Sequence, residues 1–141
     1  MRVFVAGSTG AIGKFLVPQL VEHGHDVVAV VRTAQKSTAL EAMGAKVALV
    51  DALDKEALTT AIRKAEPEVI IHQLTALAGV GNFRKFDEEF ALTNRLRTEV
   101  TDTMLAAARL VGTRRFIAQS FCGWPFAREG GPVKAEEAPL D

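Results

Sequence analysis

Three glycines near the amino terminus have the spacing of a turn that binds phosphate. Gly7, Gly10 and Gly13 follow an apolar run at residues 3–6, and an apolar helical pattern begins directly after them. Gly7 can leave a strand with a positive φ, Gly10 lets a pyrophosphate approach the backbone, and Gly13 lets the helix pack closely on the strand. The free N–H groups and positive dipole end of such a helix attract phosphate. The predicted cofactor-binding residues of this turn are Gly7, Thr9, Gly10, Ala11, Ile12 and Gly13. The alternative is a plain glycine-rich turn.

Arg32 stands at the position where a dinucleotide-binding fold distinguishes NADP from NAD. In dinucleotide-binding folds, an acidic residue near the end of the second strand accepts hydrogen bonds from the adenosine ribose. Neither Val31 nor Arg32 is acidic. A carboxylate would repel a 2′-phosphate, whereas a guanidinium binds one. We therefore expect NADP rather than NAD, with Lys36 in a position to assist. The alternative for Arg32 is a solvated surface side chain.

Two further polar residues follow predicted strands. Asp51, with Ala52, ends the third strand beside the expected adenine site, where its carboxylate accepts a bond either from the adenine amino group or from a local turn. Ser120 closes the fifth strand at the edge of the expected crevice, within reach of a substrate hydroxyl or carbonyl. It lacks the glycine-flanked elbow of a serine hydrolase. The alternative for Ser120 is local bonding to the backbone.

The histidines and the composition exclude several classes of site. His72 lies within an apolar strand and without a neighbouring histidine, so we expect a packed, hydrogen-bonded side chain rather than a metal ligand. The 17 basic and 17 acidic residues balance, which argues against nucleic acid and anionic membranes as partners. The single cysteine, Cys122, allows no intrachain disulfide. We expect a cytoplasmic protein with a small-molecule substrate, without a signal peptide or a membrane span.

The elements that position these residues alternate between strands and helices. Strands are predicted at residues 2–6, 26–31, 46–50, 68–73 and 115–119. Helices are predicted from residue 11 to Gly24 with a kink at Pro18, over 33–43 with Thr33 as the cap, from Asp54 to Pro67, and as one long helix over 86–111. This alternation predicts a Rossmann-type, doubly wound parallel α/β sheet in the order 3-2-1-4-5, with helices on both faces. The ligand should lie across the carboxyl ends of the first and fourth strands.

These features resemble the extended short-chain dehydrogenase/reductase superfamily, of the NAD(P)-dependent epimerase/dehydratase type. The glycine spacing and the Asp51-Ala52 pair match its cofactor turn and its adenine-side acidic position. Residues 74–76 stand where the family has a short Asn-Ala-Ala-like stretch, and Asn94 with Thr98 matches its N-x-x-x-T pattern. The segment 116–120 resembles the strand that ends in the catalytic serine. The resemblance implies cofactor contacts from Asp51, Ala52, Leu74, Thr75, Ala76 and Asn94, and a catalytic role for Ser120.

The resemblance also implies residues that this chain does not contain. In that superfamily a tyrosine moves the proton, and a lysine lowers the pKa of that tyrosine. This chain has no tyrosine. Trp124 stands where many members have one, and the position four residues before Lys134 is Gly130. We therefore expect an NAD(P)-binding domain at residues 1–124 of a longer oxidoreductase or epimerase, and an irregular segment at 125–141 that leads to a substrate-binding region. The chain alone should be inactive.

Two alternatives stay open. The first is a non-catalytic NADP-binding sensor or interaction module instead of part of an enzyme. The second concerns the fifth strand, which should be an open sheet edge with unpaired N–H and C=O groups. We expect either the residues after Ser120 to cover that edge or two copies of the chain to pair there as a homodimer.

Overall fold

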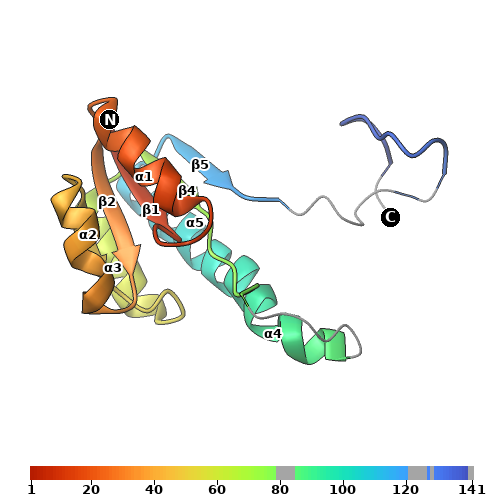
Figure 1. Cartoon of the computed structure of the whole chain (residues 1–141), viewed down its shortest axis with the longest axis horizontal. Helices are drawn as coiled ribbons and strands as arrows, with labels where there is room; N and C mark the ends of the chain where they lie inside the picture. The colour runs from red at the N-terminus through yellow and green to blue at the C-terminus, as the bar shows by residue number, and fades with distance from the viewer. Residues whose placement is uncertain (79–84, 121–126, 128, 140–141) are drawn as a thin grey trace.

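The fold is a single parallel sheet with helices on both faces (Figure 1). The computed structural model describes residues 1–78, 85–120, 127 and 129–139. The strands are β1 (Arg2–Ala6), β2 (Asp26–Val31), β3 (Lys46–Leu49), β4 (Val69–His72) and β5 (Arg115–Ala118). They lie in the order β3-β2-β1-β4-β5, and the pairings between neighbours are parallel. The predicted Rossmann-type fold and strand order are confirmed.

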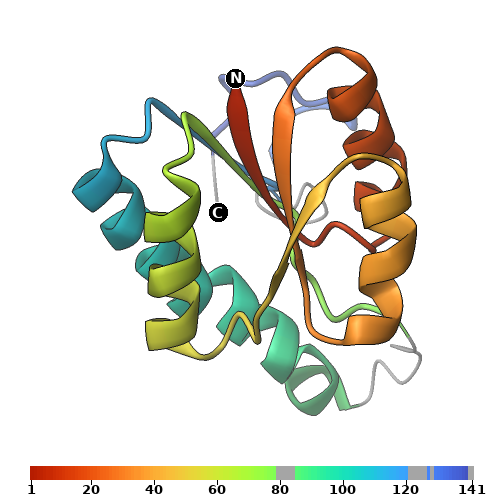
Figure 2. The ribbon, with the colours of Figure 1, turned by 90° about the vertical axis from the view of Figure 1, so that its left-hand side faces the viewer.

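The helices cover the two faces because alternate strand residues point in opposite directions. The helical elements are α1 (Gly13–Glu22), η1 (Ala34–Lys36), α2 (Ser37–Ala42), α3 (Lys55–Ala65), α4 (Phe86–Arg97) and α5 (Glu99–Val111). Val3 and Val5 of β1 share one buried cluster with Val17 of α1, whereas Phe4 of β1 shares the other with Met104 of α5. Figure 2 shows α1 and α2 on one side of the sheet and α3 and α5 on the other.

The helix predicted over residues 86–111 is interrupted at Thr98, so the prediction of one long helix is wrong. Thr98 has φ −103° and ψ −76° and separates α4 from α5. Its hydroxyl donates to the carbonyl oxygen of Asn94 at 2.8 Å, and its N–H reaches the same oxygen at 2.9 Å. Back-bonding of this kind competes with regular helix geometry and bends helices. The apolar stripe that suggested a long helix belongs to α5, whose buried residues include Val100 and Met104.

Two helix starts also differ from prediction. The segment after β2 is a 3₁₀ turn followed by α2, and Thr33 makes no capping bond with its side chain. Helix α1 begins at Gly13 rather than near Ala11 and continues through Pro18. By contrast, Asp54 caps α3 as predicted, because its carboxylate accepts hydrogen bonds from the N–H groups at positions 56 and 57. Strands β3, β4 and β5 are each one or two residues shorter than expected.

Candidate functional site

A cavity of about 750 Å³ opens at the carboxyl ends of the strands. It lies where β1 and β4 are neighbours, which is the point at which the strand order reverses and where ligands bind in sheets of this kind. Its lining residues are Gly7, Thr9, Gly10, Val30, Val31, Arg32, Thr33, Lys36, Val50, Asp51, Ala52, Leu53, Gln73, Leu74, Thr75, Ala76, Ala78, Leu92 and Leu96. The volume is in the range of small-molecule and cofactor sites.

The glycine turn forms one side of this cavity. Gly7 has φ +94°, and a Cβ atom there would lie 2.7 Å from the backbone carbon and oxygen of Gln73. A Cβ atom on Gly13 would lie 2.7 Å from the carbonyl of Ser8, so α1 approaches the turn too closely for any side chain. The turn is tied down further by Ser8, which is fully buried and donates its hydroxyl to the carbonyl of Val5 at 2.7 Å. The result is a rigid backbone cradle with little side-chain bulk.

The start of α1 leaves backbone donors available to a ligand. Within the described part of the chain, the N–H groups of Ala11, Ile12 and Gly13 have no acceptor, whereas the N–H of Lys14 donates to the carbonyl of Gly10 at 3.1 Å. Unpaired N–H groups at a helix start favour an anion. Ala11, Ile12 and Gly13 do not line the cavity, but they directly follow Gly10, which does.

The second and third strands contribute the charged side of the cavity. Arg32 follows β2, and Lys36 lies one turn later in η1; both are exposed at the cavity. Asp51 and Ala52 follow β3 and line the same space. One oxygen of Asp51 accepts a bond from the N–H of Leu53 at 3.0 Å, which is the local turn that the sequence allowed. A carboxylate has further acceptor capacity beyond this one bond.

The segment after β4 forms the opposite wall, and two buried side chains hold it. His72 is 4% exposed, its Nδ1 accepts from the N–H of Leu74 at 3.2 Å, and its Nε2 lies 3.1 Å from the carbonyl oxygen of Leu96 on α4. Thr93 is 3% exposed, and its hydroxyl oxygen accepts from the N–H of Ala76 at 2.9 Å. The expectation of a packed, hydrogen-bonded His72 is confirmed. The role of Thr93 was missed, because only the fold brings it to residue 76.

Burial lowers the pKa of His72 below its ordinary value, and the positive charge of Arg97 lowers it further. The hydrogen bond to the carbonyl of Leu96 acts in the opposite direction. His72 is therefore neutral near pH 7. Because the Leu74 N–H must donate to Nδ1, the imidazole proton lies on Nε2 and is donated to Leu96.

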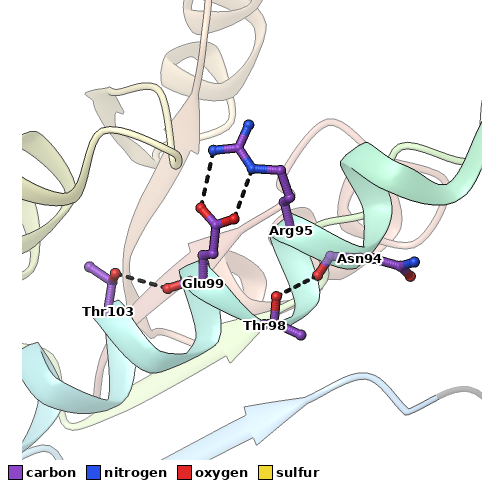
Figure 3. A network of polar contacts seen from close by, with 5 residues as sticks. All are labelled: Asn94, Arg95, Thr98, Glu99 and Thr103. Carbon is purple, nitrogen blue, oxygen red and sulfur yellow. Dashed lines mark hydrogen bonds and ion pairs between the residues drawn. The ribbon is translucent and has the colours of Figure 1, made fainter. Parts of the chain in front are cut away.

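Asn94 and Ser120 lie outside the lining of the cavity. Figure 3 shows the carbonyl of Asn94 facing Thr98, with the Arg95–Glu99 ion pair alongside. The Asn94 side chain is exposed on α4. Ser120 is exposed two residues beyond the end of β5. The N–H of its neighbour Gln119 donates to the carbonyl of His72 at 3.1 Å. Ser120 therefore lies at the carboxyl ends of the strands, where the cavity opens.

Several predictions fall on the carboxyl-terminal part of the chain. Cys122 and Trp124 lie outside the described residues. Of the segment predicted to be irregular, the described residues 127 and 129–139 contain no helix or strand. Over the ranges that the structure describes, no group of three or more His, Cys, Asp or Glu side chains could hold a metal ion, and no helix is long and apolar enough to cross a membrane.

A profile of the NAD(P)H-binding family matches residues 7–137. The chain belongs to this family. It lies within the extended short-chain dehydrogenase/reductase superfamily, as the sequence resemblance implied. It is 46% identical over 140 residues to the 3-diazoavenalumate denitrifying reductase of a Streptomyces species, covering 99% of this chain and 44% of that protein. It is 34% identical to the 4-hydroxy-2-methyl-3-oxo-4-farnesyl-3,4-dihydroquinoline-1-oxide ketoreductase of Stigmatella aurantiaca, over 83% of this chain and 32% of that protein.

Solved structures show the same fold. The UDP-glucose 4-epimerase of Thermus thermophilus, in complex with NAD, has a TM-score of 0.78 and 26% identity, with 100% of this chain and 44% of that chain covered. The UDP-Glc/GlcNAc 4-epimerase of Campylobacter jejuni has a TM-score of 0.81 and 15% identity, with coverages of 99% and 42%. This chain therefore spans less than half the length of each of these four relatives.

Proposed function

We propose that this chain is the NADP-binding domain of a reductase or epimerase that acts on a carbonyl or hydroxyl group. The observation that carries the proposal is the cavity lining that runs from the glycine turn to Arg32 and Lys36. A backbone cradle with free N–H groups suits a diphosphate, and two cations beyond it suit a further phosphate. Gly10, where an added Cβ would meet only the carbonyl oxygen of Gly7 at 3.3 Å, leaves the space at the turn that a dinucleotide backbone needs.

The preference for NADP rests on Arg32. Its guanidinium is permanently charged and presents a planar set of donors that matches a phosphate. A hydrogen bond to a charged group contributes about 1.5–3 kcal/mol, which corresponds to roughly 10- to 100-fold in affinity. Asp51, which lines the cavity and keeps acceptor capacity beyond its bond to Leu53, would accept from the adenine amino group. Leu74, Thr75 and Ala76 would contact the nicotinamide half of the cofactor from the opposite wall.

The chemistry divides between cofactor and chain. A bound nicotinamide supplies or accepts the hydride. Ser120 would donate its hydroxyl to the reacting oxygen of the substrate, which orients that oxygen and stabilises charge on it. A proton donor of the tyrosine type does not occur in these 141 residues. We therefore expect the chain alone to bind NADP(H) without turnover, and steady oxidation of NADPH with a carbonyl substrate would contradict this.

The lack of tyrosine also favours the second candidate, a non-catalytic NADP-binding sensor or interaction module. The mass of the natural gene product separates the two candidates. A product more than twice the length of this chain would support the enzyme, as the 44% coverage of the reductase relative suggests. A product of this length would support the module.

Titration with NADPH and NADH tests the cofactor assignment. The wild-type chain should bind NADPH at least about ten-fold more tightly than NADH, as measured by the enhancement of nicotinamide fluorescence or by calorimetry. Arg32→Asp should reverse this preference, because a carboxylate repels the 2′-phosphate and accepts from ribose hydroxyls. Arg63→Asp is the matched control, since Arg63 is exposed on α3 and does not line the cavity. An unchanged ratio in Arg32→Asp would refute the role of Arg32.

A further inference from the structure

We propose that Thr93 and His72 are positioning residues: together they fasten residues 74–76 to α4 in the shape that forms the cavity wall, and His72 does so only while it is neutral. The inference rests on the proposed function where it concerns cofactor affinity. Neither side chain lines the cavity itself. Each acts through the backbone of a residue that does.

Thr93 differs from the other threonines of these helices. Thr98, Thr101 and Thr103 each donate a hydroxyl to the carbonyl four residues earlier in the chain. The hydroxyl oxygen of Thr93 instead accepts the N–H of Ala76, a residue 17 positions away. The Thr93 hydroxyl thus joins its helix to a separate segment of the chain. Its hydrogen bond with Ala76 holds the segment after β4 against α4.

His72 makes the second fastening from the sheet side. Its Nδ1 receives the N–H of Leu74, and its Nε2–H is donated to the carbonyl of Leu96. One ring therefore connects the cavity wall to α4. Leu96 itself lines the cavity with Leu92, so the wall and the helix behind it form one surface.

Protonation of His72 would break one of these two bonds. A second ring proton on Nδ1 would face the Leu74 N–H, and two donors repel each other. Among the described residues, the groups that shift the pKa of the ring include no carboxylate that would compensate its positive charge. From β1 and β5 the paired residues are Ala6 and Ala118, and the ring of Phe116 lies edge-on at 6.5 Å. The charged group that acts on it from α4 is Arg97, which is itself positive. Acid should therefore release Leu74 before it unfolds the sheet.

The experiment compares buried threonines and measures two independent quantities. Thr93→Val removes the acceptor for Ala76 with little change in shape, and Thr93→Ser keeps it. Thr103→Val is the matched control, because Thr103 is 9% exposed on α5 and donates only within its own helix. Amide hydrogen exchange of Ala76 is followed in the chain without cofactor, and the Kd for NADP⁺ is measured by calorimetry at about pH 7.5.

We expect Thr93→Val to speed exchange of the Ala76 amide by roughly ten-fold and to weaken NADP⁺ binding by about five-fold or more, the loss corresponding to one hydrogen bond. Thr93→Ser should restore both values, and Thr103→Val should change neither. If the Ala76 amide of Thr93→Val exchanges at the wild-type rate, the positioning role of Thr93 is overturned. Faster exchange of the Ala76 amide with an unchanged Kd for NADP⁺ would also overturn it. If the wild-type chain binds no NADP(H), the proposed function fails, and the exchange rates still decide whether the fastening exists.

A second variant tests His72. In His72→Asn the amide oxygen can take the place of Nδ1 and accept from Leu74, but it does not titrate. Between about pH 7.5 and about pH 5.5, the wild-type affinity for NADP⁺ should fall more steeply than that of His72→Asn. The protection of the Leu74 amide, expressed relative to the intrinsic exchange rate at each pH, should decrease only in the wild type. The comparison cancels the titration of the 2′-phosphate, which is common to both. Parallel pH profiles for the two proteins would overturn the dependence on neutral His72.

Discussion

Replacing Gly13 by alanine should damage the fold far more than replacing Gly10, although the two glycines belong to one turn. The added Cβ at position 13 would lie 2.7 Å from both the carbonyl carbon and the carbonyl oxygen of Ser8, and closer still to the carbonyl oxygen of Gly7. These are backbone atoms between β1 and α1, so relief requires the helix to move away from the sheet. At position 10 the nearest atom is the carbonyl oxygen of Gly7 at 3.3 Å, which a small adjustment relieves.

The expected magnitudes follow from these contacts. Overpacking against atoms that can move costs about 1–3 kcal/mol, so a clash with fixed backbone should cost at least about 3 kcal/mol. That is a large part of the roughly 5–15 kcal/mol by which domains are stable, and it should lower the Tm by about 10 °C. Gly10→Ala should lose less than about 1 kcal/mol of stability. Because Gly10 lines the cavity, the same variant should weaken NADP⁺ binding by more than roughly ten-fold.

The assay is urea denaturation followed by circular dichroism, together with NADP⁺ titration of each variant that folds. Gly24→Ala serves as a reference for backbone strain alone, since Gly24 has φ +75° and no atom within 4 Å of the added Cβ. It should cost about 1 kcal/mol. A free energy of unfolding for Gly13→Ala within about 1 kcal/mol of that for Gly10→Ala would refute the reasoning that close packing of α1 on the turn requires glycine.

Two other predictions concern stability. Asp54→Ala should lower the free energy of unfolding by about 1 kcal/mol, because the N–H groups at the start of α3 lose their acceptor; Thr33→Ala, which removes no capping bond, should have little effect in the same urea experiment. His72 has a lower pKa in the folded chain than the ordinary value of about 6.5, so its contribution to stability is complete above about pH 6.5 and is lost as the pH falls below that value. Urea midpoints at about pH 7.5 and about pH 5.5 should therefore differ more for the wild type than for His72→Asn, and equal differences would show that His72 does not titrate as described.

Local patterns were sufficient for the centre of the fold. The runs at β1 and β2 are apolar on both faces, and strands of this kind occur almost only where helices cover a parallel sheet on both sides. The glycine turn could be predicted because the positive φ of Gly7 is a local property of the backbone, and the close approach at Gly13 is to Gly7 and Ser8 of the same turn. Asp54 could be assigned as a cap for the same reason.

The sequence was less informative where distant residues decide the structure. The break at Thr98 follows no glycine or proline, and the residue has an ordinary helix propensity. The bond from Ala76 to Thr93 joins two parts of the chain that no spacing rule connects. Asn94 was selected through resemblance alone, and its side chain lies on an exposed face of α4 outside the cavity lining.

The central position of β1 determines at which point of translation the cavity can form. Val3 pairs with Val27 on one side and with Val69 on the other, so the first strand synthesised has one flank unpaired until β4 emerges. The glycine turn is translated just before α1, but Gln73, which packs against Gly7, comes only after α3 and β4. A nascent chain that stalls before β4 therefore carries the glycine turn without the segment after β4, which forms the opposite wall of the cavity. The ability to hold a nucleotide therefore arises only after β4 and the segment behind it are translated, although the glycine turn is made first.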